Sequence, residues 1–257
     1  GPETLIGGPE TLNGGPGAEI GGPGLIHGGP AVPPGCLGLL SGGSGDLDSG
    51  VPGAPPTPGT PRLLLSPAPC APPAPFLLIL VPSAPSHLPQ RLAVRDTWGG
   101  SWGGAATPAA RTVFVLGAPA APGQQREVER ESRRYRDMLQ GDFADTYGNL
   151  TLKTLLLLRW ARACCGGAPF LLKADDDADD DVFVNVPAVA TFLAACPSPP
   201  GRLYLGRVHW RVAPNRDPRS RHHVPAGLFG AAAFPPYCSG TAYVLSRQAA
   251  TALLEAA

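Results

Sequence analysis

Apolar runs alternate with amphipathic segments between residue 76 and residue 257. The run F-L-L-I-L-V at 76–81 is short, wholly apolar and bounded by prolines, which predicts a buried strand. The predicted strands are 76–81, 111–117, 169–174 and 203–206, and the predicted helices are 88–97, 127–139, 150–164, 187–195 and 247–257. Strands that alternate with helices indicate an α/β domain with a mostly parallel sheet, whose ligands bind at the carboxyl ends of the strands.

The first 75 residues have a different composition. Residues 1–35 are five seven-residue units of the form G-P-x-x-x-x-G, and the whole chain holds 34 Gly and 33 Pro. Gly and Pro in every unit exclude a coiled coil, and the spacing excludes collagen. We expect residues 1–75 to be a disordered stem, and residues 76–257 to be one domain that is incomplete at its C-terminal side.

Charge, hydropathy and cysteine content limit the partners and the compartment that are expected for this chain. The chain has 20 Lys+Arg and 20 Asp+Glu, so its net charge gives no reason to expect a nucleic acid partner. It has no run of 18 apolar residues, so a membrane anchor is expected only outside this chain. Six cysteines without zinc-site spacing favour either disulfides in an oxidising compartment or small buried side chains.

The segment K-A-D-D-D-A-D-D-D-V-F-V-N-V at 173–186 carries the chemistry. It places six carboxylates between two apolar segments, at the end of a predicted strand, where their mutual repulsion favours a bound cation. Oxygen ligands without His or Cys favour Mg²⁺, Mn²⁺ or Ca²⁺, which commonly share their coordination with phosphates. The sequence therefore predicts a site for a metal and a nucleoside diphosphate, whereas an acidic run alone is more often a solvated loop.

Several segments resemble one family of nucleotide-sugar transferases. They are R-L-A-V-R-D-T-W-G (91–99), Y-G-N-L-T-L-K-T (147–154), the acidic segment just described, and Y-C-S-G-T-A-Y-V-L-S (237–246). Together they are similar to the β-1,3-galactosyltransferase and N-acetylglucosaminyltransferase family, glycosyltransferase family 31, over about 76–257. The stretch L-Y-L-G-R-V-H-W-R-V (203–212) most resembles the family's ganglioside-type members. The resemblance implies a GT-A type fold, in which an Asp-x-Asp stands between two strands.

The resemblance also implies an activity. It is an inverting, metal-dependent hexosyl transfer from UDP-galactose to a terminal GalNAc- or GlcNAc-type sugar of a glycolipid or glycoprotein, with Mn²⁺ or Mg²⁺ as cofactor. The implied location is the Golgi membrane, as a type II protein with a lumenal catalytic domain. The family's catalytic base is expected beyond Ala257, so a non-catalytic module that binds UDP-sugar and metal is the alternative.

The metal ligands have two possible positions, because A-D-D-D occurs twice in tandem at 174–181. Asp179 and Asp181 are favoured, because V-F-V-N follows them directly. Asp175 and Asp177 are the alternative, because F-L-L-K precedes them.

Four residues are expected to contact the donor. They are Arg91, Arg95, Lys173 and Asp180. Arg91 and Arg95 lie four residues apart, and therefore on one face of the predicted helix that follows the first strand. An alternative of equal weight is that both arginines lie on the protein surface and that Trp98 packs in the core.

Two further expectations concern covalent chemistry. Asn149 begins an N-L-T sequon, which is glycosylated only in a secretory lumen, although Asn149 is also a candidate N-cap of the following helix. Cys165 and Cys238 stand where the family often carries cysteines, so the resemblance makes them disulfide candidates.

Overall fold

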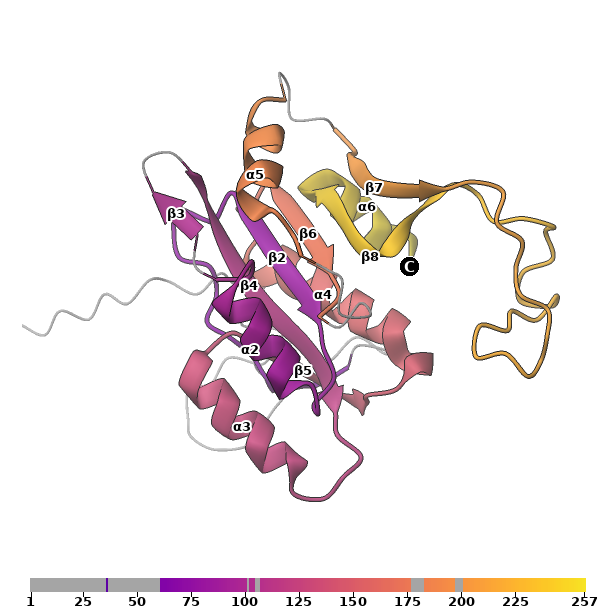
Figure 1. Cartoon of the computed structure of the whole chain (residues 1–257), viewed down its shortest axis with the longest axis horizontal. Coiled ribbons are helices and arrows are strands. Elements are labelled where there is room, and N and C mark those ends of the chain that lie inside the picture. Colours follow the sequence, from indigo (N-terminus) through magenta and orange to yellow (C-terminus); the bar gives the residue numbers. More distant parts are fainter. Residues whose placement is uncertain (1–35, 37–60, 101, 105–106, 177–182, 197–200) are drawn as a thin grey trace, which may run out of the picture. The chain divides into compact units, whose positions relative to one another are not determined.

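A mixed sheet forms the centre of the computed structural model (Figure 1), which describes residue 36 and residues 61–100, 102–104, 107–176, 183–196 and 201–257. All of these residues belong to one compact unit, 32–257. The strands are β1 (Leu63–Leu65), β2 (Leu77–Pro82), β3 (Trp102–Gly104), β4 (Thr107–Ala118), β5 (Met138–Ala144), β6 (Phe170–Ala174), β7 (Tyr204–His209) and β8 (Tyr237–Ser246). Their order is β1-β5-β4-β2-β6-β8-β7, with β3 beside β4.

The four central strands run parallel and the outer strands run antiparallel. β5, β4, β2 and β6 pair in parallel, whereas β1, β3, β7 and β8 join as antiparallel neighbours. The parallel centre confirms the predicted α/β fold, and the carboxyl ends of its strands meet at one edge of the sheet.

Helices cover both faces of the sheet. They are α2 (Leu88–Asp96), α3 (Gln124–Tyr135), α4 (Leu150–Cys164), α5 (Val186–Ala194) and α6 (Arg247–Ala256). Every residue of β2 is buried, so its alternate side chains pack on opposite faces. Leu77, Ile79 and Val81 pack with residues of α2, α3 and α5, and Leu78 and Leu80 pack with residues of α4 and α6.

Two predicted elements near the acidic segment and α3 were wrong. The helix predicted at 127–139 ends at Tyr135, where Arg136 adopts a left-handed φ of 56°, and Met138 begins β5 instead. The resemblance implied a strand directly after the Asp-x-Asp, but residues 183–185 form no strand, because Asn185 caps α5 and its side chain accepts a hydrogen bond from the Ala188 N–H at 3.1 Å. No Gly or Pro marks the end of α3, so the helical pattern alone extended past it, whereas Pro187 in the first turn of α5 marks the second boundary.

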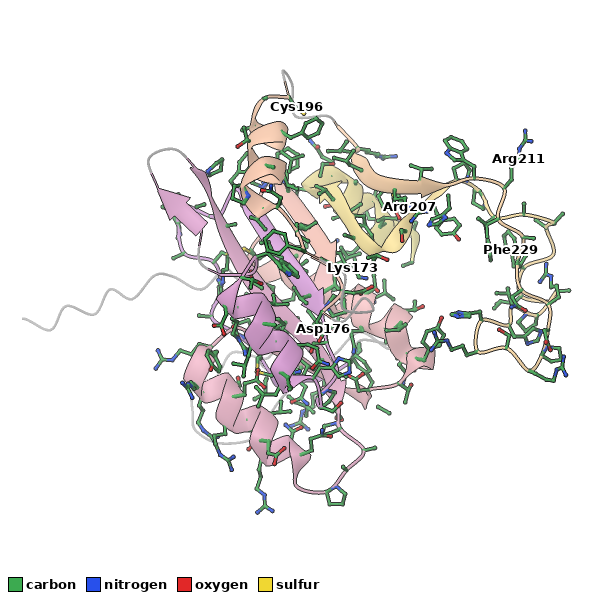
Figure 2. All side chains as sticks on the ribbon, in the orientation of Figure 1. Lys173, Asp176, Cys196, Arg207, Arg211 and Phe229 are labelled. Atoms are coloured by element: carbon green, nitrogen blue, oxygen red, sulfur yellow. A yellow bond between two sulfur atoms is a disulfide. The ribbon has the colours of Figure 1, made fainter. Side chains whose placement is uncertain are left out.

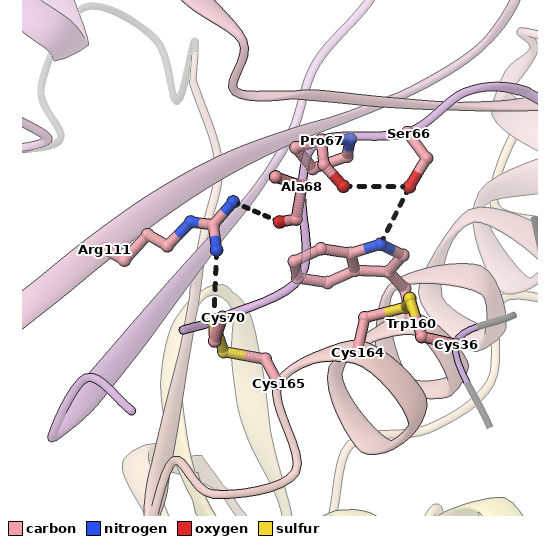
Figure 3. Close-up of a disulfide and its surroundings, with 9 residues drawn as sticks. All are labelled: Cys36, Ser66, Pro67, Ala68, Cys70, Arg111, Trp160, Cys164 and Cys165. Atoms are coloured by element: carbon pink, nitrogen blue, oxygen red, sulfur yellow. Dashed lines mark hydrogen bonds between the residues drawn. A yellow bond between two sulfur atoms is a disulfide. The ribbon is translucent and has the colours of Figure 1, made fainter. Parts of the chain in front are cut away.

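The folded unit also includes part of the segment predicted as stem. β1 pairs with β5, and the Arg111 guanidinium donates to the Ala68 carbonyl at 2.6 Å. Trp160 Nε1 donates to Ser66 Oγ at 3.1 Å (Figure 3). The boundary predicted at residue 75 was therefore too late. Apart from Cys36, residues 1–60 lie outside the described residues, and the expected disorder there stays a prediction.

The disulfides differ from the expected candidates. Cys36 is bonded to Cys164, and Cys70 is bonded to Cys165, so both bridges tie the part of the chain that precedes β2 to the end of α4 (Figure 3). Cys165 is thus in a disulfide, but Cys238 is not. Cys238 is buried on β8, close to Gly206 of the neighbouring strand, away from the end of α4.

None of the helices in the described part of the chain combines the length and the apolar character needed to cross a membrane.

Candidate functional site

A cleft of about 940 Å³ opens at the carboxyl ends of β2 and β6. This is the edge at which the parallel strands of an α/β sheet present their ligand-binding loops. The start of α4 and two segments from the β7–β8 region complete its walls. The lining residues are 82–84, 87, 145–147, 150, 153–154, 173, 175–176, 221–222, 240–241 and 243.

The acidic segment enters the cleft at the end of β6. Lys173 is the penultimate residue of this strand, and its ammonium contacts the Asp175 carboxylate and the Gly240 carbonyl. The Asp175 N–H donates to the Thr241 carbonyl at 2.9 Å, which fixes the start of the acidic loop against β8. Asp176 lies beside the loop that precedes α2, where its carboxylate is 3.4 Å from His87 Nδ1.

The described carboxylates suit a hard divalent cation. Asp175 faces the cleft with 32% of its side chain exposed, and Asp176 follows it directly. Carboxylate oxygens are the donors that Mg²⁺ and Mn²⁺ prefer. Within the described residues no group of three or more His, Cys, Asp or Glu side chains could hold an ion. Asp177, Asp179, Asp180 and Asp181 lie outside the described residues, so the choice between the two triplets stays open.

A buried ion pair forms one wall of the cleft. Lys153 of α4 is 3% exposed, and its Nζ lies 2.9 Å from both carboxylate oxygens of Asp145. The same Nζ donates to the Ser83 carbonyl at 2.8 Å, and Asp145 also accepts from the Gly117 N–H at 2.6 Å. This pair therefore holds α4 against the ends of three adjacent strands, β2, β4 and β5.

Aromatic and basic side chains also line the cleft. Tyr147 Oη lies 2.6 Å from His222 Nδ1, and the guanidinium of Arg221 lies 5.5 Å from the centre of the Tyr147 ring. Burial, followed by the nearby Tyr204 and Asp175, raises the pKa of Tyr243 to about 12. The Tyr243 phenol is therefore protonated at neutral pH and available as a hydrogen-bond donor.

The two arginines expected to contact the donor lie elsewhere. Arg91 is fully buried, and its Nε and Nη2 donate to the two carboxylate oxygens of Glu131 at 2.8 and 2.7 Å. Arg95 pairs with Glu131 and with Asp137. Both guanidinium groups thus join α2 to α3, and Arg95 also joins α2 to the loop that follows α3. Neither residue lines the cleft. The structure corrects both interpretations of these arginines, although Trp98 is in the core, as the second interpretation expected.

Asn149 occupies the N-cap position of α4 without capping it. Its side-chain amide donates to the Ala144 carbonyl at 2.8 Å, and its own side chain caps no helical N–H. The sequon remains a prediction, because glycosylation depends on the compartment.

Sequence reasoning missed several residues of the cleft. His87, Asp145 and Tyr243 were given no role, and Lys153 was quoted only as part of a motif. One signal was available: Lys153 is a single charge within the apolar helical segment L-T-L-K-T-L-L-L-L. A lone charge in such a segment indicates a buried ion pair, although its partner cannot be inferred from spacing.

Comparisons with known proteins show which family the chain is similar to. The galactosyltransferase family profile matches residues 89–257, which contain α2 to α6 and most of the cleft. Beta-1,3-galactosyltransferase 4 of Mus musculus is 42% identical over 243 residues, which cover 79% of this chain and 62% of that relative. Its Homo sapiens counterpart is 40% identical over 244 residues, with 79% and 63% covered.

A second type of relative is similar over a shorter span. Homo sapiens N-acetyllactosaminide beta-1,3-N-acetylglucosaminyltransferase 4 is 40% identical over 185 residues, which cover 72% of this chain and 47% of that relative. The chain thus spans about 62% of the length of the mouse relative. The fold has its cleft at the expected edge of the sheet, and the profile match over most of the chain confirms the predicted resemblance. The chain belongs to the galactosyltransferase family.

Proposed function

We propose that the cleft binds a UDP-sugar and that the chain is the donor-binding part of a β-1,3-glycosyltransferase, with UDP-galactose as donor. The observation that carries this proposal is the start of the acidic run, Asp175, at the carboxyl end of β6 inside a cleft of about 940 Å³. The acceptor class we propose is a terminal GalNAc- or GlcNAc-type sugar on a glycolipid or glycoprotein. In support, one relative is named for transfer to lactosylceramide and another for transfer to an acetylgalactosaminyl-O-glycosyl-glycoprotein.

The cleft residues would bind and orient the donor. Lys173 places a positive charge beside Asp175, where it can approach a phosphate oxygen of the donor. The protonated phenol of Tyr243 can donate a hydrogen bond to the same ligand. The ion pair of Lys153 and Asp145 keeps the opposite wall in position.

A divalent cation, Mn²⁺ or Mg²⁺, would be held by Asp175 together with the acidic residues that follow it. When bound, such a cation supplies charge neutralisation for the diphosphate leaving group. We assign no catalytic base to a described residue, since the side chain of Asp145 is engaged by Lys153 and Gly117.

The location that fits this function is the Golgi lumen, with an anchor outside this chain. The two disulfides fit an oxidising compartment, in which such bonds persist.

Calorimetric titration of UDP into the full chain tests the proposal. We expect binding that requires Mn²⁺ and is abolished by EDTA. Removing a residue that hydrogen-bonds a metal ligand lowers metal affinity about 10- to 100-fold. Removing a carboxylate that itself binds the metal should weaken Mn²⁺-dependent UDP binding at least as much. Asp175→Asn should therefore weaken binding at least about tenfold, whereas Asp142→Asn, an exposed carboxylate outside the cleft, should not.

The same titration distinguishes the alternatives. Binding only after deletion of residues 178–181 would show that the doubled triplet blocks the site. Absence of UDP binding in both chains would overturn the proposal. Mn²⁺-dependent binding without turnover of UDP-galactose on a GalNAc- or GlcNAc-terminated acceptor would favour the non-catalytic module.

A further inference from the structure

A second charge asymmetry lies in a segment that is mostly outside the cleft, although Arg221 and His222 of this segment line it. Residues 202–237, here called the basic arm, comprise β7, the connection to β8 and the first residue of β8. The basic arm contains six arginines and one acidic residue, Asp217, although the whole chain has equal numbers of basic and acidic residues. Asp217 is paired with Arg219 at 3.1 Å. The basic arm therefore carries an uncompensated positive charge.

The basic arm also exposes large apolar side chains. Trp210 is 69% exposed and Leu228 is 80% exposed, the latter the most exposed large hydrophobic residue of the described chain. Arg207 and Arg211 are exposed on either side of Trp210. Figure 2 shows Arg211 and Phe229 out on the connection, away from the helices that cover the sheet. Large apolar side chains exposed in the same segment as exposed arginines are typical of an interaction site.

Internal contacts hold this surface in an ordered shape. The Arg216 guanidinium donates to the carbonyls of Val224 and Phe229, each at 2.6 Å. Phe229 stacks on Phe234, with ring centroids 4.9 Å apart. Some aromatic residues of the basic arm therefore pack against one another, whereas Trp210 and Leu228 remain exposed.

We propose that the basic arm docks the protein on a membrane surface that contains anionic lipids. Trp is favoured at membrane interfaces because its amphipathic ring sits at the level of the headgroups, and Leu buries apolar area there. Arginines near an anionic surface add an electrostatic attraction that falls with ionic strength. Charge complementarity selects this partner over a neutral membrane, which would leave the arginines without counter-charges.

Vesicle co-sedimentation of the full chain tests this surface without any donor or acceptor. We expect binding to phosphatidylcholine vesicles that contain phosphatidylserine, little binding to pure phosphatidylcholine vesicles, and weaker binding at high salt. Each arginine near such a surface contributes about fivefold in affinity. The charge reversal Arg207→Glu with Arg211→Glu should therefore weaken binding at least about 25-fold.

Two further variants make the test specific. Trp210→Ser with Leu228→Ser should also weaken binding, and the high exposure of both side chains protects the fold. The matched control reverses two exposed arginines of α3, Arg126→Glu with Arg133→Glu, and should bind like the natural chain. Thermal melting confirms that each variant is folded.

Four results would overturn the proposal. They are equal binding to both vesicle types, unchanged binding in both arm variants, an equal loss in the α3 control, and sedimentation without vesicles. The last result would assign the surface to a second copy of the chain. Since no UDP-sugar is present, failure here leaves the proposed function of the cleft untouched.

Discussion

The partners of the buried charged side chains distinguish their roles in this domain. Arg91, with no exposed surface, donates to both carboxylate oxygens of Glu131, whereas Lys173, which is 9% exposed, pairs with Asp175 among the residues that line the cleft. A buried charge is stable only when it is paired and hydrogen-bonded. The four-residue spacing of Arg91 and Arg95 was therefore interpreted correctly as one helix face, but the face points to α3.

The pH dependence of stability follows from Glu131. Burial by itself would raise its pKa, but the hydrogen bonds and charges of Arg91 and Arg95 outweigh burial and hold the pKa below its ordinary 4.5. A carboxyl whose pKa is lowered by folding adds stability above its unfolded pKa, and this stability is lost as the pH falls through the lowered value. We expect the melting temperature to fall steeply below about pH 4.5.

Glu131→Gln should remove part of this acid sensitivity and cost about 3 kcal/mol at pH 7, because it leaves the buried Arg91 without a carboxylate partner and Arg95 with Asp137 alone. Thermal melts at several pH values between 7 and 3 measure both effects. Glu127→Gln, an exposed residue of the same helix, is the control. Identical pH profiles for the two variants would contradict this account.

The pair of Lys153 and Asp145 gives a second residue-level prediction. Removing one partner of a buried pair costs about 3–5 kcal/mol, mainly because the other charge is left buried. Lys153→Met should therefore destabilise the domain by about this amount in urea unfolding. The double variant with Asp145→Asn should be more stable than the sum of the single changes predicts. Strictly additive losses would show that the two groups are not coupled.

At the scale of elements, hydrophobic pattern predicted the interior of the domain well. The buried strand at 76–81 and the helix at 150–164 were recovered, since an apolar run and an uninterrupted helical segment are local properties. β1 and β5 were missed for different reasons. β1 lies in a proline-rich segment that the disulfide from Cys70 ties to the distant Cys165. β5 follows a charged helix, and no Gly or Pro marks the end of that helix.

The disulfide between Cys70 and Cys165 fastens the part of the chain that precedes β2 to α4. Cross-linking residues 95 positions apart restricts the unfolded chain, and such bonds contribute about 2–4 kcal/mol. Cys70→Ser with Cys165→Ser should lower the free energy of unfolding by this amount in urea titration. Cys196→Ser changes a cysteine that forms no disulfide and should have little effect. Equal stability of the two variants would show that the bridge does not support the fold.

At the scale of the whole molecule, the cleft joins segments that are far apart in the chain. The acidic run was placed at the end of a strand from the sequence, with Asp175 as an alternative metal ligand and Lys173 as an expected donor contact, and both residues line the cleft. His87, Asp145 and Tyr243 reach the same cleft only through the strand order β5-β4-β2-β6-β8, which no local pattern reveals. The sequence therefore predicted where the candidate site lies, but it did not predict most of the residues that line the cleft.

Hydrogen exchange with and without UDP and Mn²⁺ tests most directly the claim that this cleft is the donor site. The account predicts that UDP with Mn²⁺ slows exchange in the segments around residues 82–87, 145–154, 173–176 and 240–243, which line the cleft. Exchange in α3, which lies outside the cleft, should be unchanged. Protection that appears elsewhere and leaves these four segments unaffected would contradict it.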